Sequence, residues 1–233
     1  MAIISFTNKK LRIIAAGFAI IYILVQGFQE YVFGIIPVPN NSTEELLQGS
    51  MLLHIWRSTL LLLSFFLLIY VFLIICLQNF KKNAILSLAA FIGFMIFCFL
   101  EIGIRSIELF YTQLQMPTLY LQLKEEALKN SIIDKYMVFQ SVQTALYFPL
   151  MLSQGIASLI MTISFSIKQK INILIKIAFA INAIRLTGRL LAITLHINWF
   201  DSFSGALYFP FVVIIFGLIS VWLIKVKDEN TAG

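Results

Sequence analysis

Long apolar stretches dominate the chain and are separated by short polar segments. Six of these stretches are long enough to cross a hydrocarbon core of about 30 Å, which needs roughly 20 helical residues. We predict transmembrane helices at residues 11–36, 51–79, 84–112, 146–167, 172–196 and 204–224. The predicted fold class is all-α: a polytopic membrane protein with a single integral membrane domain over residues 1–233 and six helices in three hairpins.

The connection between the third and fourth stretches, residues 113–145, is much longer than usual. Pro117 can start a helix within it, and Tyr120, Leu123 and Ala127 share one face of that helix. We predict an amphipathic helix on the outer membrane surface. A lid over a binding site is the alternative interpretation of the same pattern.

The composition excludes a soluble globular enzyme. Apolar residues make up 60% of the chain and charged residues 12%, whereas soluble domains have about 45–50% and about 25%. Cys76 and Cys98 lie far apart within apolar stretches, so neither a disulfide framework nor a CxxC metal or redox motif is present. No HExxH, CxxCH or GxSxG pattern occurs, and we expect no metal or other cofactor.

The net charge of +6 is an orientation signal, because the basic residues fall in short clusters between apolar stretches. Such clusters indicate topology, and no nucleic acid is expected as a partner. Three of the 17 basic residues lie on one side, at Lys124, Lys129 and Lys135. The positive-inside rule therefore places both termini in the cytoplasm, in a bacterial cell membrane. Ten basic residues mark the cytoplasmic side: Lys9, Lys10, Arg12, Lys81, Lys82, Lys168, Lys170, Lys176, Lys225 and Lys227.

The remaining four basic residues are arginines inside the predicted spans. An ionisable residue at a bilayer centre costs about 2.5–3.5 kcal/mol, so such residues are functional candidates. Glu101, Arg105 and Glu108 follow at i, i+4 and i+7 and share one helix face. Arg185 lies only about 14 Å along its helix from Lys176, close to mid-membrane. Asn182, Arg185, Arg189 and His196 fall within about 60° of a helical wheel.

These polar positions converge at one depth and predict a cavity in the outer half of the bundle. We expect Arg185 and Arg189 to hold an anion, with Glu101 and Arg105 organising the site. The predicted ligand-binding residues are Gln26, Glu30, His54, Arg57, Glu101, Arg105, Glu108, Gln154, Asn182, Arg185, Arg189 and His196, with Glu30, His54 and Arg57 at the mouth.

Four arginines against three glutamates leave one positive charge in this predicted site. Guanidinium binds carboxylate and phosphate through two parallel hydrogen bonds, so we predict a small anionic or zwitterionic solute or a lipid head group as ligand, bound by a transport or receptor component. Two alternatives stay open. One is an intramembrane enzyme acting on a lipid head group, with His54 or His196 as acid or base. The other is a self-paired ion network with a purely structural role.

A pentapeptide, ALYFP, occurs at residues 145–149 and again at residues 206–210. We interpret each copy as an interfacial aromatic residue followed by a proline near the first helical turn.

Small residues at Ala15 and Ala19 are typical of close helix contacts and could serve a partner helix. In this motif and in its six-span topology, the chain resembles the substrate-binding subunits of energy-coupling-factor vitamin transporters. The long segment 113–145 departs from their pattern, and we assign no family.

Overall fold

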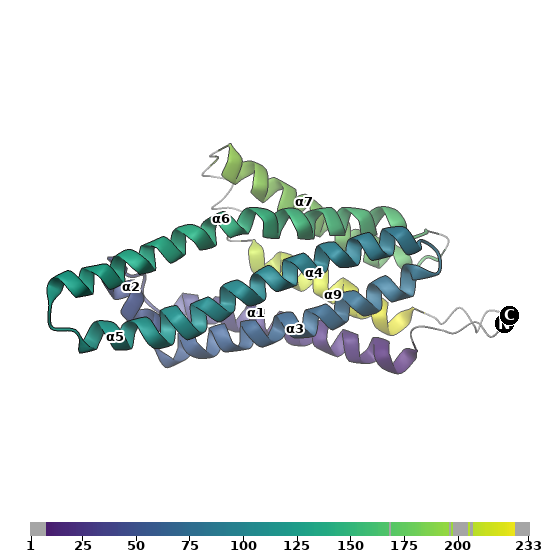
Figure 1. Cartoon of the computed structure of the whole chain (residues 1–233). Helices are drawn as coiled ribbons and strands as arrows, with labels where there is room; N and C mark the ends of the chain where they lie inside the picture. The colour runs from purple at the N-terminus through teal and green to yellow at the C-terminus, as the bar shows by residue number, and fades with distance from the viewer. Residues whose placement is uncertain (1–7, 168, 196, 198–204, 206, 227–233) are drawn as a thin grey trace.

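The computed structural model in Figure 1 is helical throughout its described elements, and it describes residues 8–167, 169–195, 197, 205 and 207–226. Within these residues, six helices are long and apolar enough to cross a membrane when α4, η1 and α5 are taken together. The elements are α1 (Lys9–Ile35), α2 (Ser42–Gly49), α3 (Leu52–Phe80), α4 (Ala84–Ile107), the π-helical η1 (Glu108–Gln115), α5 (Met116–Gln122), α6 (Glu126–Ser164), α7 (Asn172–Thr194) and α9 (Tyr208–Lys225).

The long helices pack in chain order and close into a ring. Each of α3, α4, α6 and α7 packs against the long helix before it and the one after it, and α9 packs back on α1. A closed ring therefore describes the bundle better than three separate hairpins. The end of the bundle that carries α2 and α5, at the left of Figure 1, is called the outer end, and the opposite end is called the inner end.

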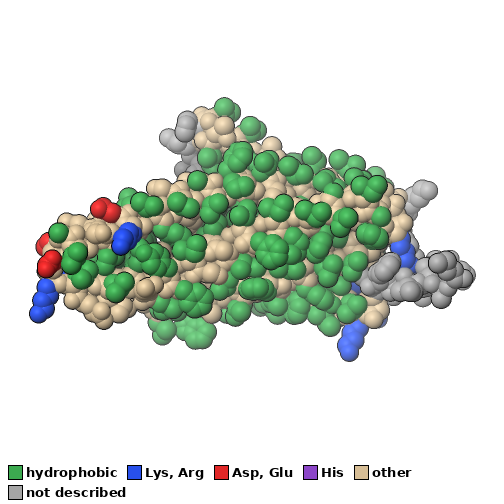
Figure 2. Space-filling view, in the orientation of Figure 1, with side chains coloured by type: hydrophobic (Ala, Val, Ile, Leu, Met, Phe, Trp, Pro, Cys, Tyr) green, Lys and Arg blue, Asp and Glu red, His purple; other side chains and the backbone are tan. Residues whose placement is uncertain are grey.

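The outside of the bundle is apolar. Figure 2 shows hydrophobic side chains along the helices on the visible face, with charged side chains gathered at the two ends. Ile85, Ile163 and Ile184 are each more than 60% exposed. A soluble monomer rarely exposes apolar patches of more than a few hundred Å². The surface is that of a multi-pass membrane protein, and it agrees with the six apolar spans.

Aromatic side chains fill the inner half of the ring. Phe72 stacks on Phe94 with ring centroids 4.0 Å apart, and Phe179 follows at 5.6 Å from Phe94. Trp222 is fully buried, and its indole N–H donates to Asn172 Oδ1 over 3.1 Å. This packing joins α3, α4, α7 and α9 and leaves the inner half of the ring filled.

A second inner contact consists of amides and hydroxyls. Asn79 donates to Ser87 Oγ over 3.1 Å and to Ser164 Oγ over 3.0 Å, while Asn83 donates to the Ser164 carbonyl over 2.6 Å. These bonds tie the inner end of α6 to α3 and to the start of α4.

Small residues on α1 lie at a contact between helices within the ring. Ala15 and Ala19 are fully buried, and Ser220 of α9 donates to the carbonyl of the intervening Ala16 over 3.4 Å. Small side chains let two helix backbones approach closely. The small residues that we expected at a partner helix thus take part in a contact within the chain.

Residues 113–145, for which we predicted a surface helix, are arranged differently in the structure. The third span continues through η1 and α5 to Gln122, and α6 begins at Glu126, so the segment consists of the ends of two long helices. The predicted span 146–167 is the inner part of α6, and Pro149 lies inside that helix rather than near its start. Some apolar positions of the segment are buried between these helix ends, whereas others, such as Leu121 and Val138, are exposed.

A small apolar core at the outer end holds these helix ends together. Leu46 of α2, Met116 of α5 and Ile132 of α6 are buried in it, and Tyr120 and Leu123 pack against them. The core fixes α2 between the two helix ends (Figure 1).

Side-chain hydrogen bonds fix the start of α2. Asn41 Oδ1 accepts from the Glu44 N–H over 2.8 Å, and the Glu44 carboxylate accepts from the Asn40 N–H over 2.8 Å. This exchange satisfies donors at the helix N-terminus. The backbone and side-chain bonds from Asn40 lower the pKa of Glu44 below its ordinary value.

Gly93 provides a test of the contact between α4 and α6. A Cβ at this position would lie 2.9 Å from Ala157 Cβ and 3.0 Å from the Ser153 carbonyl oxygen. We expect Gly93→Val to lower the free energy of unfolding by about 1–3 kcal/mol, since overpacking forces backbone shifts. Gly103→Val on the same helix is the matched control, because a Cβ there meets nothing within 4 Å. Equal loss of stability in the two variants, measured by thermal unfolding in detergent, would contradict the close approach.

Candidate functional site

The ring encloses a cavity of about 700 Å³ in its outer half, a volume within the usual range for small-molecule sites. All six long helices contribute to its wall, and α2 lines its outer end through Glu45, Leu46 and Gln48. Ten of the residues predicted from sequence line this cavity: Glu30, His54, Arg57, Glu101, Arg105, Glu108, Gln154, Asn182, Arg185 and Arg189.

Two of the predicted ligand-binding residues are not among the lining residues that the structure describes. Gln26 is buried behind the wall, where its Oε1 accepts a hydrogen bond from the Tyr208 hydroxyl over 3.0 Å. It supports a lining tyrosine instead of facing the cavity itself. His196 lies outside the described residues.

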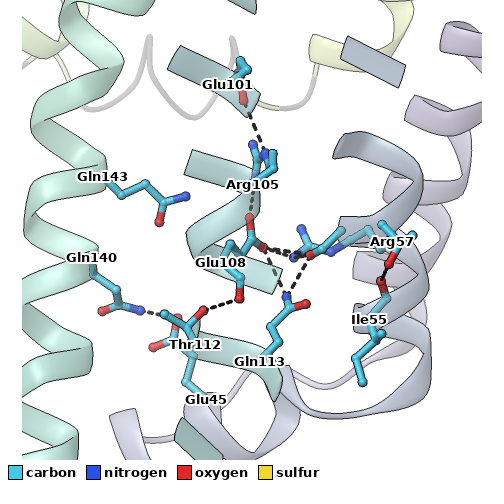
Figure 3. Close-up of polar contacts among 12 residues, drawn as sticks. Glu45, Ile55, Arg57, Glu101, Arg105, Glu108, Thr112, Gln113, Gln140 and Gln143 are labelled. Atoms are coloured by element: carbon cyan, nitrogen blue, oxygen red, sulfur yellow. Dashed lines mark hydrogen bonds and ion pairs between the residues drawn. The ribbon is translucent and has the colours of Figure 1, made fainter. Parts of the chain in front are cut away.

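One wall of the cavity is an ion-pair network, shown in Figure 3. Arg57 of α3 contacts Glu108 with 2.5 Å between Nη2 and Oε1, and Arg105 contacts the other Glu108 oxygen over 2.6 Å. Arg105 also donates to Glu101 Oε2 over 3.3 Å. Two guanidinium groups and two carboxylates thus compensate each other across α3, α4 and η1. Such pairing offsets the desolvation of charges that would be costly singly.

The π-helical segment η1 brings further polar groups to this wall. Its hydrogen bonds run from i to i+5 and shift the register of the side chains, so Glu108, Thr112 and Gln113 all line the cavity. Gln113 donates to Ser58 Oγ over 2.9 Å and to Glu108 Oε1 over 3.3 Å. The Thr112 hydroxyl donates to the Glu108 carbonyl over 2.6 Å. In an α-helix with 3.6 residues per turn, the side chains of Thr112 and Gln113 would point in different directions. The sequence pattern therefore did not predict that both line the cavity.

Arg185 of α7 has a different environment. Its Nη2 donates to Asn182 Oδ1 over 3.1 Å, and its Cζ lies 5.3 Å from the ring centroid of Tyr208. Asn182 is held in turn by donating to Ser158 Oγ over 2.8 Å. Among the described residues, no carboxylate oxygen lies within 4.0 Å of Arg185, and its buried Nε–H has no hydrogen-bond partner there.

Three tyrosines line the cavity that were not among the predicted site residues: Tyr22, Tyr147 and Tyr208. Tyr147 and Tyr208 are the tyrosines of the two ALYFP copies, which we interpreted as interfacial. The structure turns both toward the cavity, while Phe148 is 54% exposed. The ALYFP repeat was the sequence feature that could have identified Tyr147 and Tyr208 as lining residues. Its tyrosine, rather than its phenylalanine, faces the interior of the ring.

Glu45 is a further lining residue that the sequence pattern did not reveal. It comes from α2, outside the predicted spans, and its carboxylate accepts from Gln140 of α6 over 2.7 Å. Within the described lining, Glu30, Glu45, Glu101 and Glu108 balance the four arginines, with His54 neutral. The formal surplus of one positive charge inferred from the sequence is therefore absent from this lining, and the wall carries equal numbers of both signs.

Glu108 is the residue on which the network depends. We expect Glu108→Gln to lower the free energy of unfolding by about 3–5 kcal/mol, because it leaves two buried guanidinium groups without this partner. Glu30→Gln is the control, since Glu30 is exposed and forms no ion pair with a described residue. Its expected change is within about 0.5 kcal/mol. Unfolding in mixed detergent micelles measures both, and a small loss for Glu108→Gln would contradict the role of the network.

The chain matches no family model, no curated protein and no solved structure. Its function is therefore argued from the chemistry of the cavity. The two features that bear on it are a charge-compensated wall on α3, α4 and η1, and a guanidinium on α7 that has no carboxylate within ion-pair distance among the described residues.

Proposed function

We propose that this chain is a multi-pass membrane protein that binds a small anionic or zwitterionic molecule, either a solute or a lipid head group, in the cavity of its outer half. Arg185 carries the proposal. A partly buried cation without a carboxylate partner is costly in an apolar surrounding, and a ligand carboxylate or phosphate would supply that partner. The planar guanidinium accepts such a group through two parallel hydrogen bonds.

The neighbouring groups support a ligand-binding role for Arg185. Asn182 and Tyr208 hold the guanidinium at the cavity wall. Gln154 also lines the cavity, is buried, and has no hydrogen-bond partner among the described residues. Its amide offers both a donor and an acceptor to a ligand. The purely structural interpretation fits the paired set of Arg57, Arg105 and Glu108 better than it fits these residues.

Packing supports a binding component of a transport or receptor system over an autonomous carrier. The inner half of the ring is filled by Phe72, Phe94, Phe179 and Trp222. A carrier alternates access to a site near mid-membrane. A cavity on one side with a filled opposite half is the arrangement expected of a protein that captures its ligand from one face.

We also propose the cytoplasm as the location of the inner end, in a bacterial cell membrane. Lys9, Lys10, Lys81 and Lys225 lie at or next to the inner ends of their helices. Basic residues concentrate on the cytoplasmic side of membrane proteins. The cavity would then face the extracytoplasmic side.

The binding role is tested by analysing what the protein retains when it is purified in mild detergent. We expect native mass spectrometry to detect a bound small molecule or lipid in the natural chain. Its occupancy should fall by about tenfold or more in Arg185→Gln, since a hydrogen bond to a charged group contributes about 1.5–3 kcal/mol. Arg185→Lys should retain only part of the binding, because lysine cannot bind in a bidentate manner.

Lys10→Gln is the matched control, because it removes one exposed positive charge outside the cavity. Occupancy in this variant should equal that of the natural chain. If nothing is retained by the natural chain, or if Arg185→Gln retains as much as Lys10→Gln, the proposed function is wrong.

Orientation is tested by cysteine labelling in intact cells. Cys76 and Cys98 are buried, so the background should be low. A membrane-impermeant maleimide should label Lys124→Cys in intact cells, and Lys81→Cys only after permeabilisation, because both positions are exposed but lie at opposite ends of the bundle. The reverse labelling pattern would contradict the proposed orientation.

A further inference from the structure

Glu101 presents an uncommitted carboxylate oxygen at the same cavity as Arg185. Its Oε2 accepts from Arg105 over 3.3 Å, whereas its Oε1 has no hydrogen-bond partner among the described residues. The residue is 8% exposed and lines the cavity. Glu101 is the innermost charged lining residue of α4, and Arg185 is that of α7. The deep end of the cavity therefore carries one acceptor and one donor group of opposite charge.

These two groups do not neutralise each other. No ion pair within 4.0 Å joins Glu101 to Arg185 among the described residues. Tyr22 of α1 and Tyr208 of α9 line the same cavity, and the Tyr208 ring centroid lies 5.3 Å from Arg185 Cζ. The cavity wall thus combines a negative group on α4, a positive group on α7 and tyrosines on α1 and α9.

We propose that the ligand is a zwitterion, with its anionic group bound by Arg185 and its ammonium group bound by Glu101. This inference rests on the proposed function and specifies its ligand class. A ligand with only an anionic group would leave Glu101 Oε1 without a hydrogen-bond donor among the described residues. A ligand with only an ammonium group would leave Arg185 without a partner.

The rest of the deep wall indicates that the zwitterion has an apolar body. Leu186 of α7 and Val212, Ile215 and Phe216 of α9 line the cavity. A volume of about 700 Å³ exceeds the need of the charged groups alone. A peptide-like solute and an aminophospholipid share this chemistry, and the experiment separates the two sources.

The solute arm uses the dipeptide leucyl-leucine and calorimetric titration of the purified protein in detergent. N-acetyl-leucyl-leucine keeps only the anionic group, and leucyl-leucinamide keeps only the ammonium group. If the source is a solute, we expect each single-charge probe to bind about tenfold or more weakly than the dipeptide.

The lipid arm uses nanodiscs that contain equal amounts of phosphatidylethanolamine, N-acetyl-phosphatidylethanolamine and phosphatidylglycerol. Of the three lipids, only phosphatidylethanolamine is zwitterionic. If the source is a lipid, native mass spectrometry should show it enriched on the protein about tenfold over the other two.

Variants connect each charge of the ligand to its residue. Arg185→Gln and Glu101→Gln should both weaken binding of the zwitterionic probe by about tenfold or more. Only Arg185→Gln should weaken the anion-only probe. Glu101→Asp keeps the charge and should restore part of the zwitterion binding. Thermal unfolding without ligand identifies any variant that fails to fold, and Lys10→Gln serves again as the charge control.

Preferential zwitterion binding in either arm, lost in both glutamine variants, supports the proposal. If the anion-only probe binds as tightly as the zwitterion, or if Glu101→Gln leaves zwitterion binding unchanged, the zwitterion proposal is wrong while the proposed function stands. If neither zwitterion binds and the retained molecule is not zwitterionic, the proposal is equally wrong. If no probe binds and no molecule is retained, both the zwitterion proposal and the proposed function fail.

Discussion

The cost of placing charge inside a ring of apolar helices is the constraint on which this structure depends. Arg57, Arg105 and Glu108 could not remain in the interior singly, and their mutual contacts join α3, α4 and η1 at the level where the cavity opens. Burial of the pairs is tolerated because each carboxylate oxygen of Glu108 has a guanidinium partner. Arg185 differs from these residues. Within the described chain, its positive charge is compensated by an amide oxygen and an aromatic ring face.

The two halves of the ring solve the packing problem differently. The inner half is filled by stacked aromatic rings and by the side-chain hydrogen bonds of Asn79 and Asn172. The outer half spreads polar groups over the wall and keeps about 700 Å³ open. Ala15 and Ala19 are fully buried and let α1 pack closely against its neighbours in the inner half.

The spans and most of the charged lining residues could be predicted from the sequence, because both follow from the hydropathy and the spacing of residues close together along the chain. Long apolar runs identify spans, and the i, i+4, i+7 spacing places Glu101, Arg105 and Glu108 on one face without any tertiary information. Glu45 could not be found in this way, since α2 reaches the cavity only through packing against α5 and α6. The inward direction of Tyr147 likewise depends on how α6 is rotated in the ring, which hydropathy does not encode.

The continuity of α6 has a mechanical consequence. Its 39 residues correspond to a rod of about 58 Å, which carries Gln140 beside Glu45 in its outer part and Ser164 beside Asn79 at its inner end. Displacement of α2 at the mouth of the cavity would therefore be transmitted along a single lever to the inner end. Pro149 is the one residue in this rod that lacks a backbone N–H, so bending of the lever would concentrate in the turn that precedes it.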